Sequence, residues 1–189
     1  MTGPDRGTRM SRRIRRTLEE AGLEADHVVR SHEVAMAHRR ARLADDHHPH
    51  FLHPGRTVLV AVGDAELRDP ELLALAPLLD SLHPELAPGG AGLVLPLPLR
   101  GLADADGAPV TDPDTLLESL VTLDPGPLAL VLSEALDHLR HLHLSDDPAL
   151  QRRVALRTEA VLLPLAGRMG GTLDRRYRWW WRRVGRGMA

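Results

Sequence analysis

The spacing of apolar and polar positions predicts a chain built mainly from helices. Between residues 24 and 44, apolar positions recur with a period near 3.6 among charged residues, which is typical of an amphipathic helix. Similar spacing and helix start signals predict further helices over residues 10–21, 69–82, 112–123, 127–143, 146–169 and 172–186. The exception is the segment 57–62, Thr-Val-Leu-Val-Ala-Val, whose β-branched side chains favour a strand.

Turn-forming residues indicate where several helices begin, bend or end. Asp69 and Asp112 each precede a proline, a combination that suits the N-cap and the first position of a helix. Pro77 should kink its helix, because proline lacks the backbone N–H of a regular turn. The pair Gly170-Gly171 is expected to separate the last two helices.

Two segments lack a helical pattern. Residues 83–112 are rich in proline and glycine and are predicted to form a long irregular excursion, which in a compact domain is either functional or mobile. Residues 1–9 contain Gly3, Pro4 and Gly7 and are expected to be a disordered start. The remainder, 10–189, has a length that suits one domain with a real core.

Composition narrows the chemistry. The chain has no cysteine, so any metal must be bound by His, Asp or Glu. The formal net charge of -2 argues against general nucleic-acid binding, and every basic residue apart from histidine is arginine, which suits carboxylate or phosphate. No run approaches the ~18 apolar residues of a membrane span and no secretory signal is apparent, so the cytoplasm is the expected location.

Three stretches, read in order, carry a recognisable pattern. They are Ala37-His38 with Pro49-His50-Phe51-Leu52-His53-Pro54, then Leu78-Leu79-Asp80-Ser81, and finally Ala135-Leu136-Asp137-His138-Leu139-Arg140-His141-Leu142 with Thr158, Pro164-Leu165-Ala166 and Arg168-Met169-Gly170. Together they resemble the hydrolase domain of the RelA/SpoT alarmone enzymes, a branch of the metal-dependent HD phosphohydrolases. The resemblance implies an all-α, HD-domain-like helical bundle, and therefore a helix rather than a strand over residues 56–65.

The resemblance also implies a metal site. The ligands carried over from the family are His53, Asp80 and Asp137, with His83 as a possible substitute for Asp80. Such a set of oxygen and nitrogen ligands suits Mn²⁺ or Mg²⁺. An ion there would lower the pKa of a bound water and polarise a phosphoryl oxygen.

The same resemblance implies a nucleotide-like pyrophosphate or another phosphorylated small molecule as substrate. Basic residues near the first motif contact the nucleotide in the family, and Arg39 and Arg42 fall there. The alternative interpretation is that these arginines form the solvated face of an amphipathic helix.

The His-Asp pair that defines HD enzymes is replaced here by Asp80-Ser81. This departure favours a degenerate HD protein, catalytically impaired or inactive, with a binding or regulatory role and without a necessary metal. Asp137 would then satisfy a buried backbone or arginine group. The alternative is a surviving metal-dependent phosphohydrolase.

A third hypothesis is a helical interaction module unrelated to HD chemistry. Three consecutive tryptophans, Trp179, Trp180 and Trp181, lie in the predicted C-terminal helix. Three consecutive helical residues span about 200°, so at least one indole should be half exposed. These tryptophans are therefore candidates for a homodimer or partner interface. The alternative interpretation is that the final helix packs across the bundle with arginine side chains over the indoles.

Overall fold

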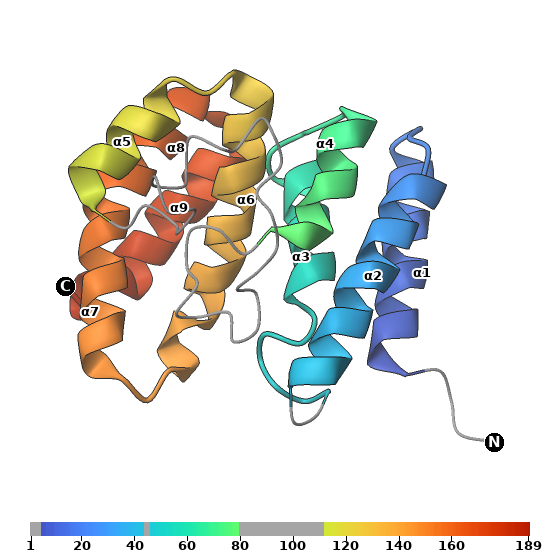
Figure 1. Ribbon diagram of the computed structural model, residues 1–189. Coiled ribbons are helices and arrows are strands. Elements are labelled where there is room, and N and C mark those ends of the chain that lie inside the picture. The colour runs from blue at the N-terminus through green and yellow to red at the C-terminus, as the bar shows by residue number, and fades with distance from the viewer. Residues whose placement is uncertain (1–4, 44–45, 80–111) are drawn as a thin grey trace.

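The computed structural model describes residues 5–43, 46–79 and 112–189, and within these ranges it contains helices and no strand (Figure 1). The all-α class predicted from the sequence is confirmed. The α-helices are α1 (Arg6–Glu20), α2 (Asp26–Arg42), α3 (His53–Gly63), α4 (Pro70–Leu75), α5 (Pro113–Val121), α6 (Pro125–His141), α7 (Pro148–Arg157), α8 (Leu163–Met169) and α9 (Gly171–Arg183). Short helical turns follow four of them, η1 (Ala76–Leu78), η4 (Leu142–Leu144), η5 (Thr158–Leu162) and η6 (Gly185–Gly187).

The helices form two groups that meet at α3 and α6. Helices α1 to α4 lie on the right of Figure 1 and α5 to α9 on the left. Helix α3 packs against α6, and it also contacts α1 and α2. In the described part of the chain no helix is long and apolar enough to cross a membrane. The contact between α3 and α6 is the structural basis of the candidate site.

Residues 57–62 are helical, as the family resemblance implied and contrary to their strand propensity. They belong to α3, in which Val58, Val60, Ala61 and Val62 are all buried. A helix buried on most of its faces has a nearly continuous apolar sequence, so periodicity cannot distinguish it from a buried strand. Gly55 permits this burial, because a Cβ there would collide with Met10 of α1.

Helix α1 begins at Arg6, so residues 6–9 are helical although the sequence predicted them to be part of a disordered start. The reason is the N-cap. The Asp5 side chain accepts a hydrogen bond from the Thr8 backbone N–H at 2.8 Å, and it pairs with Arg40 of α2 at 3.1 Å. A capping carboxylate also interacts well with the positive end of the helix dipole.

The predicted start and stop signals lie at helix ends. Asp69 and Asp112 accept hydrogen bonds from the first backbone N–H groups of α4 and α5. At Pro77 the α-helix gives way to the tighter turn η1. Gly170 and Gly171 have φ values of 70° and 64°, a left-handed conformation that glycine adopts readily, and they separate α8 from α9.

The predicted helix over 146–169 forms as a continuous helical run with one irregular turn. Between α7 and α8, residues Thr158–Leu162 adopt a π-helix, which ends two residues before Pro164. Proline lacks an N–H and clashes with the carbonyl four residues earlier, and a wider turn relieves both problems.

One cluster of buried apolar side chains extends from α1 to α9. Leucine, valine and alanine dominate it, and Trp180 and Tyr177 of α9 are its largest fully buried side chains. The Tyr177 hydroxyl donates to the Leu132 carbonyl of α6 at 2.7 Å. This packing holds α9 against the same helix that carries the site. The excursion predicted over 83–112 lies, apart from Asp112, outside the described residues.

Candidate metal centre

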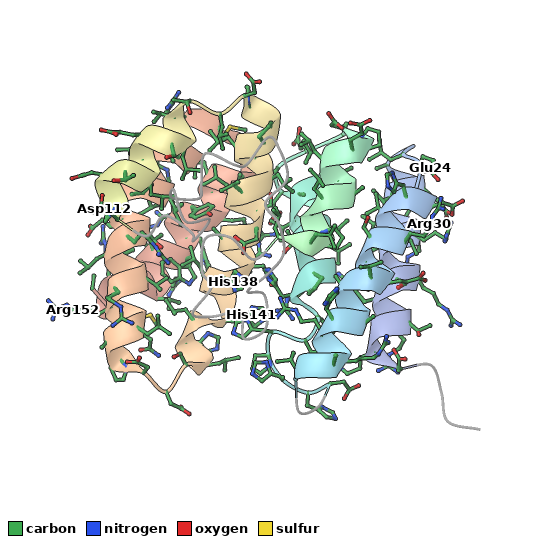
Figure 2. All side chains as sticks on the ribbon, in the orientation of Figure 1. Glu24, Arg30, Asp112, His138, His141 and Arg152 are labelled. Atoms are coloured by element: carbon green, nitrogen blue, oxygen red, sulfur yellow. The ribbon has the colours of Figure 1, made fainter. Side chains whose placement is uncertain are left out.

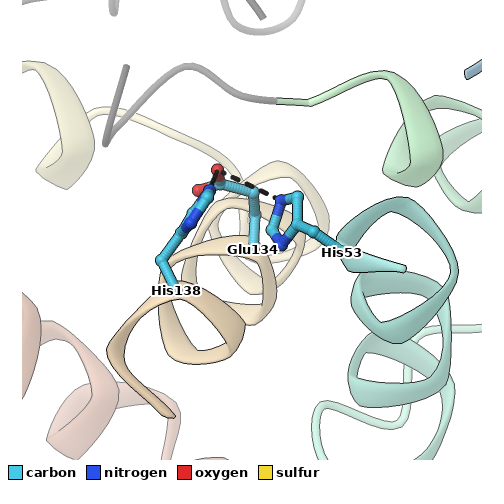
Figure 3. Close-up of side chains that lie close together, drawn as sticks. All are labelled: His53, Glu134 and His138. Carbon is cyan, nitrogen blue, oxygen red and sulfur yellow. Dashed lines mark ion pairs between the residues drawn. The ribbon is translucent and has the colours of Figure 1, made fainter. Parts of the chain in front are cut away.

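Helices α3 and α6 bring three potential metal ligands together. His53 is the first residue of α3, while Glu134 and His138 lie four residues apart on α6 and therefore share a face. Figure 3 shows the three side chains pointing toward one another across the gap between the two helices. Figure 2 places His138 on α6 in the interior of the molecule, whereas charged residues such as Glu24, Arg30 and Arg152 lie at its periphery.

The spacing of these side chains suits a small cation. Oε1 of Glu134 lies 2.9 Å from Nε2 of His138 and 3.7 Å from Nε2 of His53. The two imidazole rings stack with their centroids 3.9 Å apart. Because metal–ligand bonds of about 2.0–2.2 Å place the ligand atoms of one ion about 3 to 3.6 Å apart, small side-chain adjustments would seat an ion among them. His53, Glu134 and His138 therefore form a group that could hold a metal ion.

Burial makes the Glu134 carboxylate costly without a counter-charge. The side chains of His53, Glu134 and His138 are 0–1% exposed. Neither oxygen of Glu134 accepts a hydrogen bond of good geometry from a residue that the structure describes. A buried carboxylate normally requires pairing or metal coordination.

Asp137 orients His53. Oδ2 of Asp137 accepts a hydrogen bond from Nδ1 of His53 at 2.9 Å, and both its oxygens accept from Nε of Arg56 at 2.9 Å. Burial alone would raise the pKa of Asp137, but the hydrogen bond from His53 and the positive charge of Arg56 hold this pKa well below its usual range.

An ionised Asp137 fixes the tautomer of His53. Since the carboxylate can only accept, Nδ1 of His53 donates to it, and in the neutral form of the imidazole Nε2 presents its lone pair toward Glu134. Two acceptors then face each other, and a cation between them would satisfy both. A carboxylate behind a ligating imidazole is a common outer partner in metal sites.

Other histidines surround this group. His50 lies 5.5 Å from His138 and 6.4 Å from His141, measured between ring centroids. Burial, and then the neighbouring His138, lowers the pKa of His50 to about 3. Nδ1 of His141 hydrogen-bonds the Asp137 carbonyl at 2.8 Å, and burial lowers the pKa of His141. These rings are therefore neutral near pH 7.

The structure unites part of the predicted ligand set. His53 and Asp137, both predicted as ligands, are hydrogen-bonded to each other, but only His53 belongs to the group that could hold an ion. Asp137 pairs with Arg56, the kind of partner expected in a degenerate protein. Asp80 and His83 lie outside the described residues, so their predicted role remains a prediction. Divalent metal binding is supported at the level of a suitable ligand group, without indicating which metal.

The predicted substrate contacts of Arg39 and Arg42 remain a prediction. Arg39 is 5% exposed, so it does not belong to a solvated helix face, and the side chain of Arg42 lies outside the described part. Among the three tryptophans, Trp179 is 55% exposed while Trp180 and Trp181 are buried, which confirms that one indole reaches solvent. Their predicted role in a dimer or partner interface remains a prediction.

Sequence reasoning missed Glu134 and His138 as ligands, and it missed Arg56. The signal for Glu134 was present, because a Glu and a His four residues apart on a predicted helix share one face. Arg56 follows His53 by three residues on α3 and contacts Asp137 on α6. Arg56 and Asp137 are 81 positions apart in the sequence, and no local pattern predicts their contact.

Comparisons with known proteins add no identification. No protein-family model matches the chain, and neither the curated proteins nor the solved structures include a significant match. The expected membership of the HD family is therefore unsupported, and functional inference depends on the geometry of this molecule.

Proposed function

We propose that this chain is a metal-binding helical protein that holds one divalent first-row transition-metal ion between His53, Glu134 and His138. The observation that carries the proposal is the buried Glu134 carboxylate, which lies between two imidazoles and accepts no well-formed hydrogen bond from the described residues. Two imidazoles and one carboxylate favour Zn²⁺ or a neighbouring metal over Mg²⁺, which prefers oxygen ligands.

The ion would serve binding and stability rather than turnover. A catalytic metal site keeps a position open to substrate, whereas the three ligand side chains here are 0–1% exposed. An ion among them would neutralise Glu134 and join α3 to α6, and so it would tighten the contact between the two helix groups. This favours the inactive, binding type of protein expected from the loss of the HD dyad over the active phosphohydrolase.

The test is a calorimetric titration of metal-stripped, full-length protein with Zn²⁺ and, separately, with Mn²⁺. Thermal unfolding is then measured with and without the metal. We expect one ion per chain and a rise in unfolding temperature, since a ligand at 100 times its Kd stabilises the folded state by about 2.7 kcal/mol. Glu134→Gln keeps the side-chain shape and should weaken binding at least ten-fold. Asp137→Asn should weaken it about 10- to 100-fold, as outer partners of ligating histidines do.

His143→Gln is the matched control, because His143 is exposed and belongs to η4, just beyond the site. Equal binding by the Glu134→Gln and His143→Gln proteins would place the ion elsewhere and overturn the proposal. A pyrophosphate hydrolysis assay with Mn²⁺ completes the test. We expect no turnover; turnover that disappears in Glu134→Gln would replace the binding role with a catalytic one.

A further inference from the structure

A second feature adjoins Asp137 and Arg56. It is a cavity of about 450 Å³ bounded by α1, α3, α6 and α9. This volume lies within the range of small-molecule sites. Asp137 and Arg56 belong to its lining, whereas the three candidate metal ligands do not. The cavity is therefore separate from the candidate metal centre.

The lining carries an excess of positive charge. It contains four arginines, Arg13, Arg56, Arg140 and Arg176, and two aspartates, Asp64 and Asp137. Both carboxylates are already paired. Arg56 contacts Asp137 at 2.9 Å, and Arg140 contacts Asp64 at 2.7 Å, with Arg176 more distant at 3.6 Å.

Arg13 remains uncompensated. It makes no hydrogen bond or ion pair within the described part of the chain. The balance of four cations against two anions leaves two positive charges that face the cavity. An occupant with a dianionic group would neutralise that excess, and the planar guanidinium fork suits a phosphate group in particular.

The tryptophans supply the second, independent observation. Trp180 is 2% exposed and its indole Nε1–H has no acceptor among the described residues. The far edge of its ring, at Cζ3, lies against Gly185, so the N–H edge points the other way. A buried donor without an acceptor is unfavourable. Because this N–H is itself covered, a ligand oxygen in the cavity would become its acceptor only after a small shift of the surrounding side chains.

The walls also offer a flat apolar surface. Trp179, which is 55% exposed, lines the cavity together with the aliphatic side chains of Leu59, Val60 and Leu136. An exposed indole beside arginines is suited to stacking with a flat ring. We propose that this cavity binds a small molecule that joins a dianionic phosphate monoester to a flat apolar ring.

The experiment uses metal-stripped, full-length protein in EDTA, so that its outcome is independent of the metal proposal. Phenyl phosphate, inorganic phosphate and phenol are titrated separately, with tryptophan fluorescence and calorimetry as readouts. We expect phenyl phosphate to bind more tightly than either fragment. Arg13→Gln should weaken both phosphates about ten-fold, whereas Trp179→Ala should weaken phenyl phosphate and leave inorganic phosphate unchanged.

Arg12→Gln is the matched control, because Arg12 is the exposed neighbour on α1 and does not line the cavity. Trp180→Phe keeps an aromatic ring, removes the N–H donor and should weaken both phosphates without changing the circular dichroism spectrum. The proposal is overturned if phenyl phosphate fails to bind at millimolar concentration. It is equally overturned if Arg12→Gln and Arg13→Gln weaken binding by the same factor.

Discussion

The His53–Glu134–His138 group and the arginine-lined cavity adjoin the same residue, Asp137, yet they are built in opposite ways. The group consists of three side chains that are 0–1% exposed and held by the packing of two helices. The cavity is rimmed by long side chains such as Arg13, Arg176 and Trp179 that are largely exposed. Burial makes every charge in the first region depend on a partner, while water solvates the charges of the second. Substitutions should therefore change stability in the first region and ligand binding alone in the second.

The largest expected effect follows from removing the carboxylate between the two regions. Asp137→Ala leaves buried His53 and half-buried Arg56 without their shared acceptor. Breaking a buried ion pair from one side typically costs about 3–5 kcal/mol. Urea unfolding of the metal-free protein should show a loss of this size. Asp64→Ala removes the other cavity carboxylate, and an equally large loss there would contradict the contrast between the regions.

Replacing the buried carboxylate of Glu134 by an apolar side chain tests whether this charge stabilises the metal-free protein. Glu134→Met removes the buried charge and keeps a similar volume. A buried carboxylate without a counter-charge carries a desolvation cost, which an apolar side chain of similar size does not have. Thermal unfolding of the metal-free variant should therefore occur at an equal or higher temperature, while Zn²⁺ no longer stabilises it. A marked loss of stability without metal would mean that Glu134 has a structural partner of its own.

His32 is a buried histidine outside both regions, and it shows how burial changes a histidine pKa where no carboxylate causes the shift. Burial, and then the charge of Arg40, lowers the pKa of His32 to about 4, from an ordinary value of 6.5. Between these two values the unfolded chain binds a proton that the folded chain does not, so stability falls as pH decreases from 6.5 toward 4. At pH 5 the loss should be about 2 kcal/mol relative to pH 7. The free energy of unfolding is measured at both pH values in the wild type and in His32→Gln. The contribution of His32 is the difference between the two proteins in the change from pH 7 to pH 5.

The smallest effect is expected at the rim of the cavity. Arg13→Gln alters an exposed side chain that has no partner in the described part of the chain. Exposed substitutions away from special features usually change stability by less than about 0.5 kcal/mol. Chemical denaturation should therefore give wild-type stability even where phosphate affinity falls. A loss above about 1 kcal/mol would show that the rim contributes to the fold as well.

The sequence predicted the helices better than it predicted the site. Start signals such as Asp69 and Asp112 act over three or four residues, so they can be interpreted locally. Propensity alone was misleading at 57–62, because burial on most faces removes the polar stripe of a helix. His53 and Asp137 were both singled out before their contact was known, but through a family resemblance that the comparisons do not support.

Glu134 and the cavity escaped prediction for a different reason. Glu134 becomes notable only once His53, 81 residues earlier, packs against its helix, since a single Glu in an amphipathic helix is otherwise ordinary. The cavity is assembled from α1, α3, α6 and α9, and its arginines share no motif. Long-range packing creates both features; the Glu134–His138 spacing is a weak local signal, and the cavity has none.

The position of Asp137 has a consequence for how the two sites would communicate. One carboxylate receives Arg56 from the cavity side and His53 from the metal side. An anion that attracts Arg56 would weaken the contact between Arg56 and Asp137, so that Asp137 could hold His53 more firmly. A metal ion on His53 would strengthen the hydrogen bond from His53 to Asp137, and Arg56 would then be freer to bind an anion. Thermodynamic linkage requires that the factor by which the metal changes anion affinity equal the factor by which the anion changes metal affinity. Because both sites contact the side chain of Asp137, the affinity measured for either ligand would depend on whether the other ligand is bound.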